Sequence, residues 1–200
     1  MSQLLTTSRG LITIHPATTN DATRLHDLRL EALANHPQAF AADHDMTRDQ
    51  GVEAWVDRMR QNEAGNEGII YVAETGEQLV GMTGLYRGHW PKSLHSGLIW
   101  GVYVREPWRG ERIAEALLEA CIAWARAQGM TIVKLGVATG NMVAIRCYVR
   151  CGFTVYGLEP QAIYYDGVFY DELLMARATE HPRGFLNGID TFVEREPDRE

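Results

Sequence analysis

The 200-residue chain has few cysteines, only Cys121, Cys147 and Cys151. Three cysteines cannot form the paired framework of a small disulfide-rich protein, so we expect reduced thiols, which suit a reducing compartment. Cys147 and Cys151 are four residues apart, as some metal ligands are, but no His or third Cys lies nearby to complete a site. We therefore predict no bound metal.

The sequence also has no long apolar segment and no excess of basic residues. No apolar run approaches the roughly 20 residues that cross a bilayer. The first ten residues lack the basic start and apolar stretch of a secretory signal. These absences predict a cytoplasmic protein with no membrane partner. With 19 Lys and Arg against 26 Asp and Glu, the formal charge is -7, which argues against nucleic acid as a partner.

The composition is that of one globular domain. Hydrophobic residues make up 46% of the chain, enough to bury a real core. From Thr179 onward Pro, Gly and charged residues accumulate. We therefore predict a folded domain over residues 1–178 and a C-terminal tail over 179–200, which is mobile or used for association.

Hydrophobic periodicity predicts a mixed α/β sheet layered with helices. The predicted strands cover residues 11–15, 69–73, 79–86, 97–104, 132–137, 153–156 and 169–176. The predicted helices cover residues 20–36, 52–59, 113–128 and 141–151. Residues 38–47 are interpreted as a loop. Two aromatic residues within predicted strands, Tyr86 and Trp100, are expected in the core, with an acceptor pocket as the alternative.

The first motif runs from Pro107 to Leu118 and reads Pro-Trp-Arg-Gly-Glu-Arg-Ile-Ala-Glu-Ala-Leu-Leu. A strand ends before it, the chain turns at Gly110, and a helix starts. The first turn of a helix has unpaired N–H groups and the positive end of the dipole, which together suit a pyrophosphate. Taken alone, an ordinary turn with solvated arginines explains the motif equally well.

The second motif runs from Asn141 to Phe153 on the following predicted helix. Asn141, Ile145 and Tyr148 are spaced by four and then three residues, so they share one face. Asn141 and Tyr148 lie about 10 Å apart along the axis, far enough to hold one ligand at two points. Gly152 followed by Phe153 is typical of a helix end that packs an aromatic ring back on the helix.

Together the two motifs resemble the acetyl-CoA signature of the GNAT N-acetyltransferase superfamily. The first is similar to its Q/R-x-x-G-x-G/A loop, and the second to its N-x-x-A-x-x-x-Y-x-x-x-G-F helix. The resemblance implies a mixed, mainly antiparallel central sheet with flanking helices. It also implies acetyl-CoA as co-substrate and direct transfer to an amine, with a small-molecule acceptor and a possible homodimer. The alternatives are a protein or peptide acceptor, and a non-catalytic acyl-CoA sensor.

The resemblance also assigns roles by position. The strand at 102–104 would part from its neighbour and pair with the pantetheine arm, and backbone N–H groups of 109–115 would hold the pyrophosphate. Tyr148 would donate a proton to the leaving thiolate; its structural alternative is a packed ring with its hydroxyl bonded elsewhere. The predicted cofactor-binding residues are Val102, Tyr103, Val104, Arg109, Gly110, Glu111, Arg112, Ile113, Ala114, Glu115 and Asn141.

The sequence departs from the family pattern at one position, and it offers no clear general base. Arg112 stands where the pattern most often has Gly, and we expect it to keep a helical φ, with its guanidinium on a phosphate or in solvent. The strand at 97–104 contains no carboxylate to act as general base. The base is therefore left unassigned among an ordered water, Glu31, Asp43 and Glu159.

Overall fold

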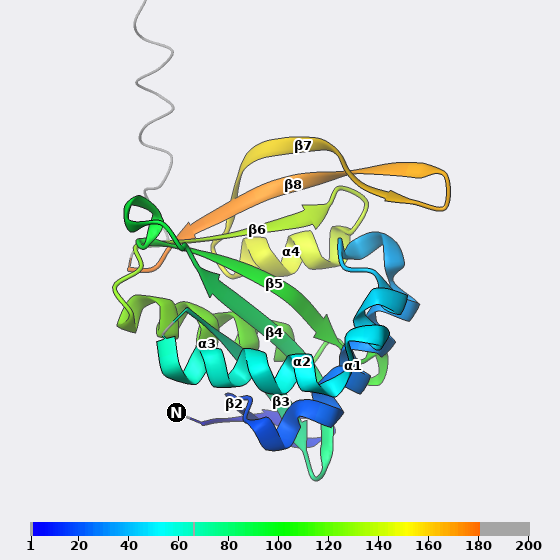
Figure 1. Cartoon of the computed structure of the whole chain (residues 1–200), viewed down its shortest axis with the longest axis vertical. Coiled ribbons are helices and arrows are strands. Elements are labelled where there is room, and N and C mark those ends of the chain that lie inside the picture. The colour runs from blue at the N-terminus through cyan, green and yellow to red at the C-terminus, as the bar shows by residue number, and fades with distance from the viewer. Residues whose placement is uncertain (1, 66, 181–200) are drawn as a thin grey trace, which may run out of the picture.

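The computed structural model describes residues 2–65 and 67–180, which form one eight-stranded sheet covered by helices (Figure 1). The strands are β1 (Gln3–Thr7), β2 (Gly10–Pro16), β3 (Gly68–Thr75), β4 (Gln78–Arg87), β5 (Ser96–Val104), β6 (Ile132–Ala138), β7 (Thr154–Tyr165) and β8 (Val168–Ala178). The helices are α1 (Ala22–Asn35), α2 (His44–Gly65), α3 (Ile113–Ala127) and α4 (Met142–Arg150).

The strand order is β1-β2-β3-β4-β5-β6-β8-β7, and every neighbouring pair is antiparallel except β5 and β6. The parallel pair follows from the chain path, because α3 crosses over between these two strands and returns the chain to the same edge. This arrangement confirms the mixed, mainly antiparallel sheet with flanking helices that the sequence predicts.

The prediction misses β1 and misplaces several boundaries, among them the end of β7, which is predicted at residue 156 and lies at Tyr165. No strand is predicted over Gln3–Thr7, where the structure has the edge strand β1, which pairs only with β2. Leu4 is 64% exposed there, so the segment lacks the alternation of buried and exposed residues that would indicate a strand. The predicted loop over 38–47 is instead partly helical, because α2 begins at His44. The Asp43 carboxylate accepts a hydrogen bond from the Met46 N–H at 2.8 Å and so caps this helix. A kink at Gly51, with φ of 69°, separates this first part from the predicted helix over 52–59.

The two parallel strands separate along their length. Residues pair from Ser96 with Ile132 to Leu98 with Lys134, and beyond this point β5 and β6 continue without pairing. In Figure 1 they start together at the left, and their arrowheads lie apart at the right. The cause is a bulge in β5, where Gly101 has φ of 65° and the register against β4 shifts between Met82 and Gly84. The backbone of the last part of β5 is thereby left accessible on one edge.

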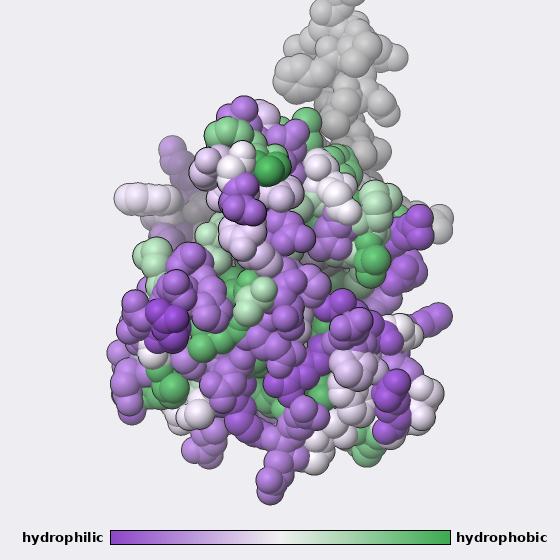
Figure 2. Space-filling view, turned by 90° about the vertical axis from the view of Figure 1, so that its right-hand side faces the viewer, coloured by the Kyte–Doolittle hydropathy of each residue, from purple (hydrophilic) through white to green (hydrophobic). Residues whose placement is uncertain are grey.

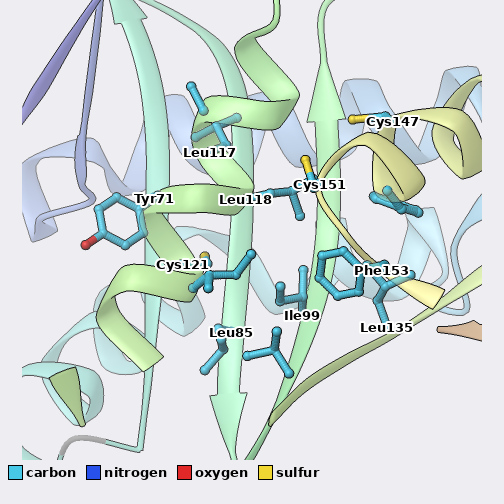
Figure 3. Packing of buried hydrophobic residues seen from close by; sticks show 14 of the residues in the cluster. Tyr71, Leu85, Ile99, Leu117, Leu118, Cys121, Leu135, Cys147, Cys151 and Phe153 are labelled. Atoms are coloured by element: carbon cyan, nitrogen blue, oxygen red, sulfur yellow. The ribbon is translucent and has the colours of Figure 1, made fainter. Parts of the chain in front are cut away.

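Helices cover both faces of the sheet. Helices α1 and α2 bury a cluster against β3 and β4 that includes Leu25, Trp55 and Met82. Helices α3 and α4 pack on the other face, where the larger part of the core lies. Figure 3 shows Leu118 and Cys121 of α3 directed at the strands, beside Ile99. The three cysteines are buried as free thiols within this core.

The surface of the described residues is mostly hydrophilic on the side towards which β5 and β6 open, with hydrophobic residues confined to small patches (Figure 2). Within these residues no helix is both long and apolar enough to cross a membrane. The predicted tail lies outside the described residues from position 181 onward.

Candidate functional site

The loop between β5 and α3 presents unpaired backbone N–H groups. Gly110 has φ of 86°, and Arg112, the N-cap of α3, has φ of 60° and ψ of 21°. No N–H group from Gly110 to Glu115 donates a hydrogen bond to another described residue, whereas the N–H of Ala116 donates to the Arg112 carbonyl. When residues that precede a helix have a left-handed backbone, successive N–H groups point towards one common position. Such a group of N–H donors forms a concave anion site.

The predicted helical φ of Arg112 is wrong. Its backbone is left-handed, which costs a non-glycine residue roughly 1–2 kcal/mol and explains why glycine is common in the family pattern at this position. The left-handed conformation is nevertheless the one that lets the next N–H groups point outward. Arg112 therefore keeps the loop geometry at a cost in backbone strain.

Side chains around this loop mainly hold it in place. Arg109 turns back to β5, where its Nε donates to the Val104 carbonyl at 3.0 Å and its Nη2 lies 2.8 Å from His36 Nε2. The Glu111 carboxylate accepts from the backbone N–H of Ser8 at 2.9 Å and also from its hydroxyl. Any contact from Glu111 to an anion would accordingly come from its backbone.

The loop is also joined to the core and to α4. Ile113 is 1% exposed, and Glu115 pairs with Arg150 at 2.6 Å, which ties α3 to α4. Like Glu111, Glu115 therefore offers only its backbone N–H to the loop.

Helix α4 carries the two polar residues of the second motif. The Asn141 side-chain oxygen accepts from the Ala144 N–H at 3.2 Å, so this residue caps the helix. Tyr148 is only 6% exposed, and its ring contacts Phe153 edge-on with centroids 6.1 Å apart. No hydrogen bond joins the Tyr148 hydroxyl to another described residue. Burial, helped by the nearby thiols of Cys147 and Cys151, raises the pKa of Tyr148, which keeps the phenol protonated.

A cleft of about 630 Å³, which we call the donor cleft, lies where β5 and β6 separate. It brings together predicted residues from the strand, the loop and α4. These are Val102, Tyr103, Val104, Arg109, Ala114, Asn141 and Tyr148. The remaining predicted residues, Gly110, Glu111, Arg112, Ile113 and Glu115, lie in and just after the loop that precedes Ala114.

A second cavity of about 700 Å³, the acceptor cavity, adjoins the first. The two share Phe40, Trp100, Gly101 and Gly136 among their lining residues, so they meet at the gap between β5 and β6. Tyr86 and Trp100 are half-buried and both line the acceptor cavity, as the alternative expectation had it, while Trp100 also packs against the core cluster under α1 and α2. Their rings stack there with centroids 5.1 Å apart.

Sequence reasoning missed one carboxylate, Glu172 on β8. It lines the acceptor cavity, and a Cβ at Gly136 would lie 2.3 Å from its Oε2, so the absence of a side chain at Gly136 makes room for it. Burial, together with the neighbouring charge of Glu159, raises the pKa of Glu172. The signal in the sequence was the acidic pair Asp171 and Glu172 within the mainly apolar strand Val168–Ala178.

The three carboxylates proposed from sequence differ in their suitability as a base. Glu31 is engaged elsewhere, since it accepts from the Tyr103 hydroxyl at 2.9 Å and pairs with Arg105 at 2.8 Å. Asp43 and Glu159 do line the acceptor cavity, but Asp43 caps α2. Glu172 is thus the carboxylate whose burial and raised pKa best suit proton acceptance.

Comparison with known proteins gives a family match and several relatives. Residues 28–153 match the model of the Acetyltransferase (GNAT) family. An L-methionine sulfoximine/L-methionine sulfone acetyltransferase of Pseudomonas aeruginosa is 40% identical over 60 residues, which are 30% of this chain and 35% of that protein. This chain therefore matches only about a third of the length of that curated relative.

Solved structures show the same fold. The structure of yncA from Salmonella typhimurium with its cofactor acetyl-CoA matches with a TM-score of 0.73 at 22% identity, over 85% of this chain and 95% of that one. A ribosomal-protein-alanine N-acetyltransferase from Brucella melitensis matches with a TM-score of 0.69 at 25% identity, over 82% of this chain and 98% of that one. The family match spans strands β3 to β6, the loop between β5 and α3, and helix α4. The chain belongs to the acetyltransferase (GNAT) family, whose acetyl donor is acetyl-CoA.

Proposed function

We propose that this protein transfers the acetyl group of acetyl-CoA directly to the amine of a small molecule, with both substrates bound at once. The observation that carries this proposal is the meeting of the donor cleft and the acceptor cavity at the gap between β5 and β6. A thioester lying in one space and an amine entering from the other would come together at this gap without a covalent enzyme intermediate.

The donor side has the groups that acetyl-CoA requires. The unpaired N–H groups of residues 110–115 would hold the pyrophosphate, and the positive end of the α3 dipole adds to their attraction. The accessible edge of Val102–Val104 would pair with the amides of the pantetheine arm, as one strand pairs with another. Asn141 lines the same cleft and would contact the arm while it caps α4.

The chemistry needs one proton acceptor and one proton donor. Glu172 would take a proton from the ammonium form of the acceptor, directly or through a water, and leave a neutral amine. The nitrogen lone pair then forms the C–N bond at the thioester carbon, and the C–S bond breaks. Tyr148 would donate its proton to the departing sulfur, and its raised pKa ensures that the proton is present. The new amide nitrogen then loses its second proton, through water, to the Tyr148 phenolate, which restores the neutral phenol, and Glu172 releases its proton to solvent.

Two observations support a small acceptor. The acceptor cavity is a defined space of about 700 Å³ lined by aromatic side chains, which is the size of typical small-molecule pockets. The Pseudomonas relative is named for small amino-acid analogues. A protein amine is the second candidate, because the Brucella structure is named for a ribosomal-protein alanine. A cytoplasmic location, a homodimer and the role of the tail remain predictions from the sequence.

The test is CoA release from acetyl-CoA across a panel of amines, amino acids, polyamines, aminoglycosides and short peptides. A readout that does not react with thiols is needed, because the protein contains three cysteines. Rapid release with one class of small amine is the expected result. Release confined to peptides would favour the protein acceptor. Release no faster than hydrolysis, with acetyl-CoA still bound, would contradict the proposal and favour a sensor.

A further inference from the structure

Arg29 on α1 is a buried cation that faces the acceptor cavity. It is 6% exposed and lines the cavity, and its Nη1 is buried with no hydrogen-bond partner among the described residues. Its guanidinium carbon lies 4.6 Å from the ring centroid of Phe40 and 6.0 Å from that of Trp100. Aromatic faces stabilise such a cation partially, but they do not replace the hydrogen bonds that burial removes.

A second arginine lies beside the first. The guanidinium carbon of Arg58 on α2 is 5.3 Å from the Trp100 ring centroid and 5.1 Å from that of Trp55. Burial, with a contribution from Arg58, lowers the pKa of Arg29 to about 10, so it is still positively charged at neutral pH. Within residues 2–65 and 67–180 neither arginine forms an ion pair with a carboxylate. Two close cations without a counter-ion are unfavourable in a folded protein unless a ligand neutralises them.

Carboxylates also line this cavity. Glu159 of β7 and Glu172 of β8 line the same space as Arg29 and Arg58. The charged lining of the cavity thus consists of the cations Arg29, Arg58 and Lys134 and the carboxylates Asp43, Glu159 and Glu172, and the two arginines both come from helices. The position of a Cβ on Gly101 would be 3.4 Å from Arg29 Nη1, which places this nitrogen beside the bulge where the two cavities meet.

We propose that Arg29, supported by Arg58, binds a carboxylate on the acceptor, so that the acceptor is a free amino acid or a close analogue. This inference rests on the proposed function, because it names the substrate class of the same site. The guanidinium would donate two parallel hydrogen bonds to the carboxylate. The α-amino group would then lie towards Glu172, the proposed proton acceptor, and apolar side chains would contact Trp55 and Phe40.

A purely structural role for Arg29 predicts a different result on mutation. If stacking between Phe40 and Trp100 were its purpose, Arg29→Met would destabilise the fold. If its role is to bind an anionic ligand, the same change removes an unpaired buried charge from the unliganded protein, whose stability should then be unchanged or higher. Thermal unfolding of the protein without acceptor separates the two roles.

The main experiment uses apolar amino acids, each paired with its carboxamide and its decarboxylated amine. For the wild type we expect kcat/KM to favour the amino acid over the decarboxylated amine. In Arg29→Met the ratio of kcat/KM for the amino acid to kcat/KM for the decarboxylated amine should fall about 100-fold, because the charge-assisted hydrogen bonds from arginine to the carboxylate are lost. Arg29→Lys should restore part of this ratio. Arg60→Met is the matched control, since Arg60 lies exposed on α2 and pairs with Asp57; it should leave the ratio unchanged.

A binding measurement separates this inference from the proposed function. Trp55 and Trp100 line the acceptor cavity, so tryptophan fluorescence should report binding of an N-acetylated amino acid to the CoA-loaded protein. Carboxylate-dependent binding that Arg29→Met abolishes would support the inference, even if no amine in the panel were acetylated. Transfer to amines and amino acids with equal kcat/KM would overturn it while leaving the proposed function intact. Loss of stability in Arg29→Met with an unchanged ratio would also overturn it.

Discussion

Replacing Tyr148 with Phe removes only the hydroxyl that is proposed to protonate the leaving thiolate. The hydroxyl makes no hydrogen bond to another described residue, so its removal leaves no polar group without a partner. The ring keeps its edge contact with Phe153 at 6.1 Å. The free energy of unfolding should therefore change by less than about 1 kcal/mol.

The effect on transfer should be much larger. Loss of a positioned general acid typically slows a reaction by roughly 100-fold or more, which corresponds to about 2.7 kcal/mol in the activation barrier. Affinity for acetyl-CoA should stay close to that of the wild type, because the proposed pyrophosphate and pantetheine contacts come from the loop before α3, from β5 and from Asn141, and none of them uses the Tyr148 hydroxyl. The raised pKa of Tyr148 means that loss of its proton should not limit the wild type at pH values below about 10, the ordinary pKa of a phenol.

The assay is turnover at saturating concentrations of both substrates, together with acetyl-CoA affinity by calorimetry. Tyr71→Phe is a suitable control, because Tyr71 is also 6% exposed but packs in the core against α3. That variant should retain wild-type turnover. An unchanged kcat in Tyr148→Phe would remove Tyr148 from the mechanism, and a large loss of acetyl-CoA affinity would show that its role is binding.

Other groups give further expected outcomes. Because Glu172 must be ionised to accept a proton, wild-type kcat/KM should fall as the pH drops through its raised pKa. Glu172→Gln should be about 100-fold slower and should no longer show this fall at acidic pH. If the fall persists in the variant, another group is responsible for it. Arg112→Gly should raise the free energy of unfolding by about 1 kcal/mol in a denaturant titration, because its left-handed backbone is then unstrained, and a decrease would contradict that reading. Asp21→Ala should lower the free energy of unfolding by about 2 kcal/mol, since the carboxylate accepts from the Thr18 N–H at 2.8 Å and from Arg24. Although burial alone would raise the pKa of Asp21, these hydrogen bonds leave it lowered in the folded protein. The stability that Asp21 contributes should therefore be present above its pKa in the unfolded chain, and it should disappear as the pH falls through its pKa in the folded protein.

The sequence by itself determined the fold class, and it predicted residues that the fold brings together around the donor cleft. These features depend on local patterns that are readable in one dimension. Gly110 marks the turn before α3, Asn141 is the N-cap of α4, and Tyr148 lies two turns further along the same helix. Each signal follows from helix geometry and backbone conformation within a dozen residues, and the resemblance to the GNAT signature then related these residues to acetyl-CoA. The same reasoning failed at Arg112, because a left-handed φ on a non-glycine residue has no reliable signal in the sequence.

Only the tertiary structure decided the acceptor side. Arg29, Trp100 and Glu172 are far apart in the sequence and come from α1, β5 and β8, yet they line one cavity. Their proximity depends on which helices cover which face of the sheet and on how far β5 and β6 separate. Each residue also has an ordinary local interpretation, as a surface arginine, a core aromatic and a solvated carboxylate. Burial and the absence of partners distinguish these residues, and both properties arise only when distant segments pack together.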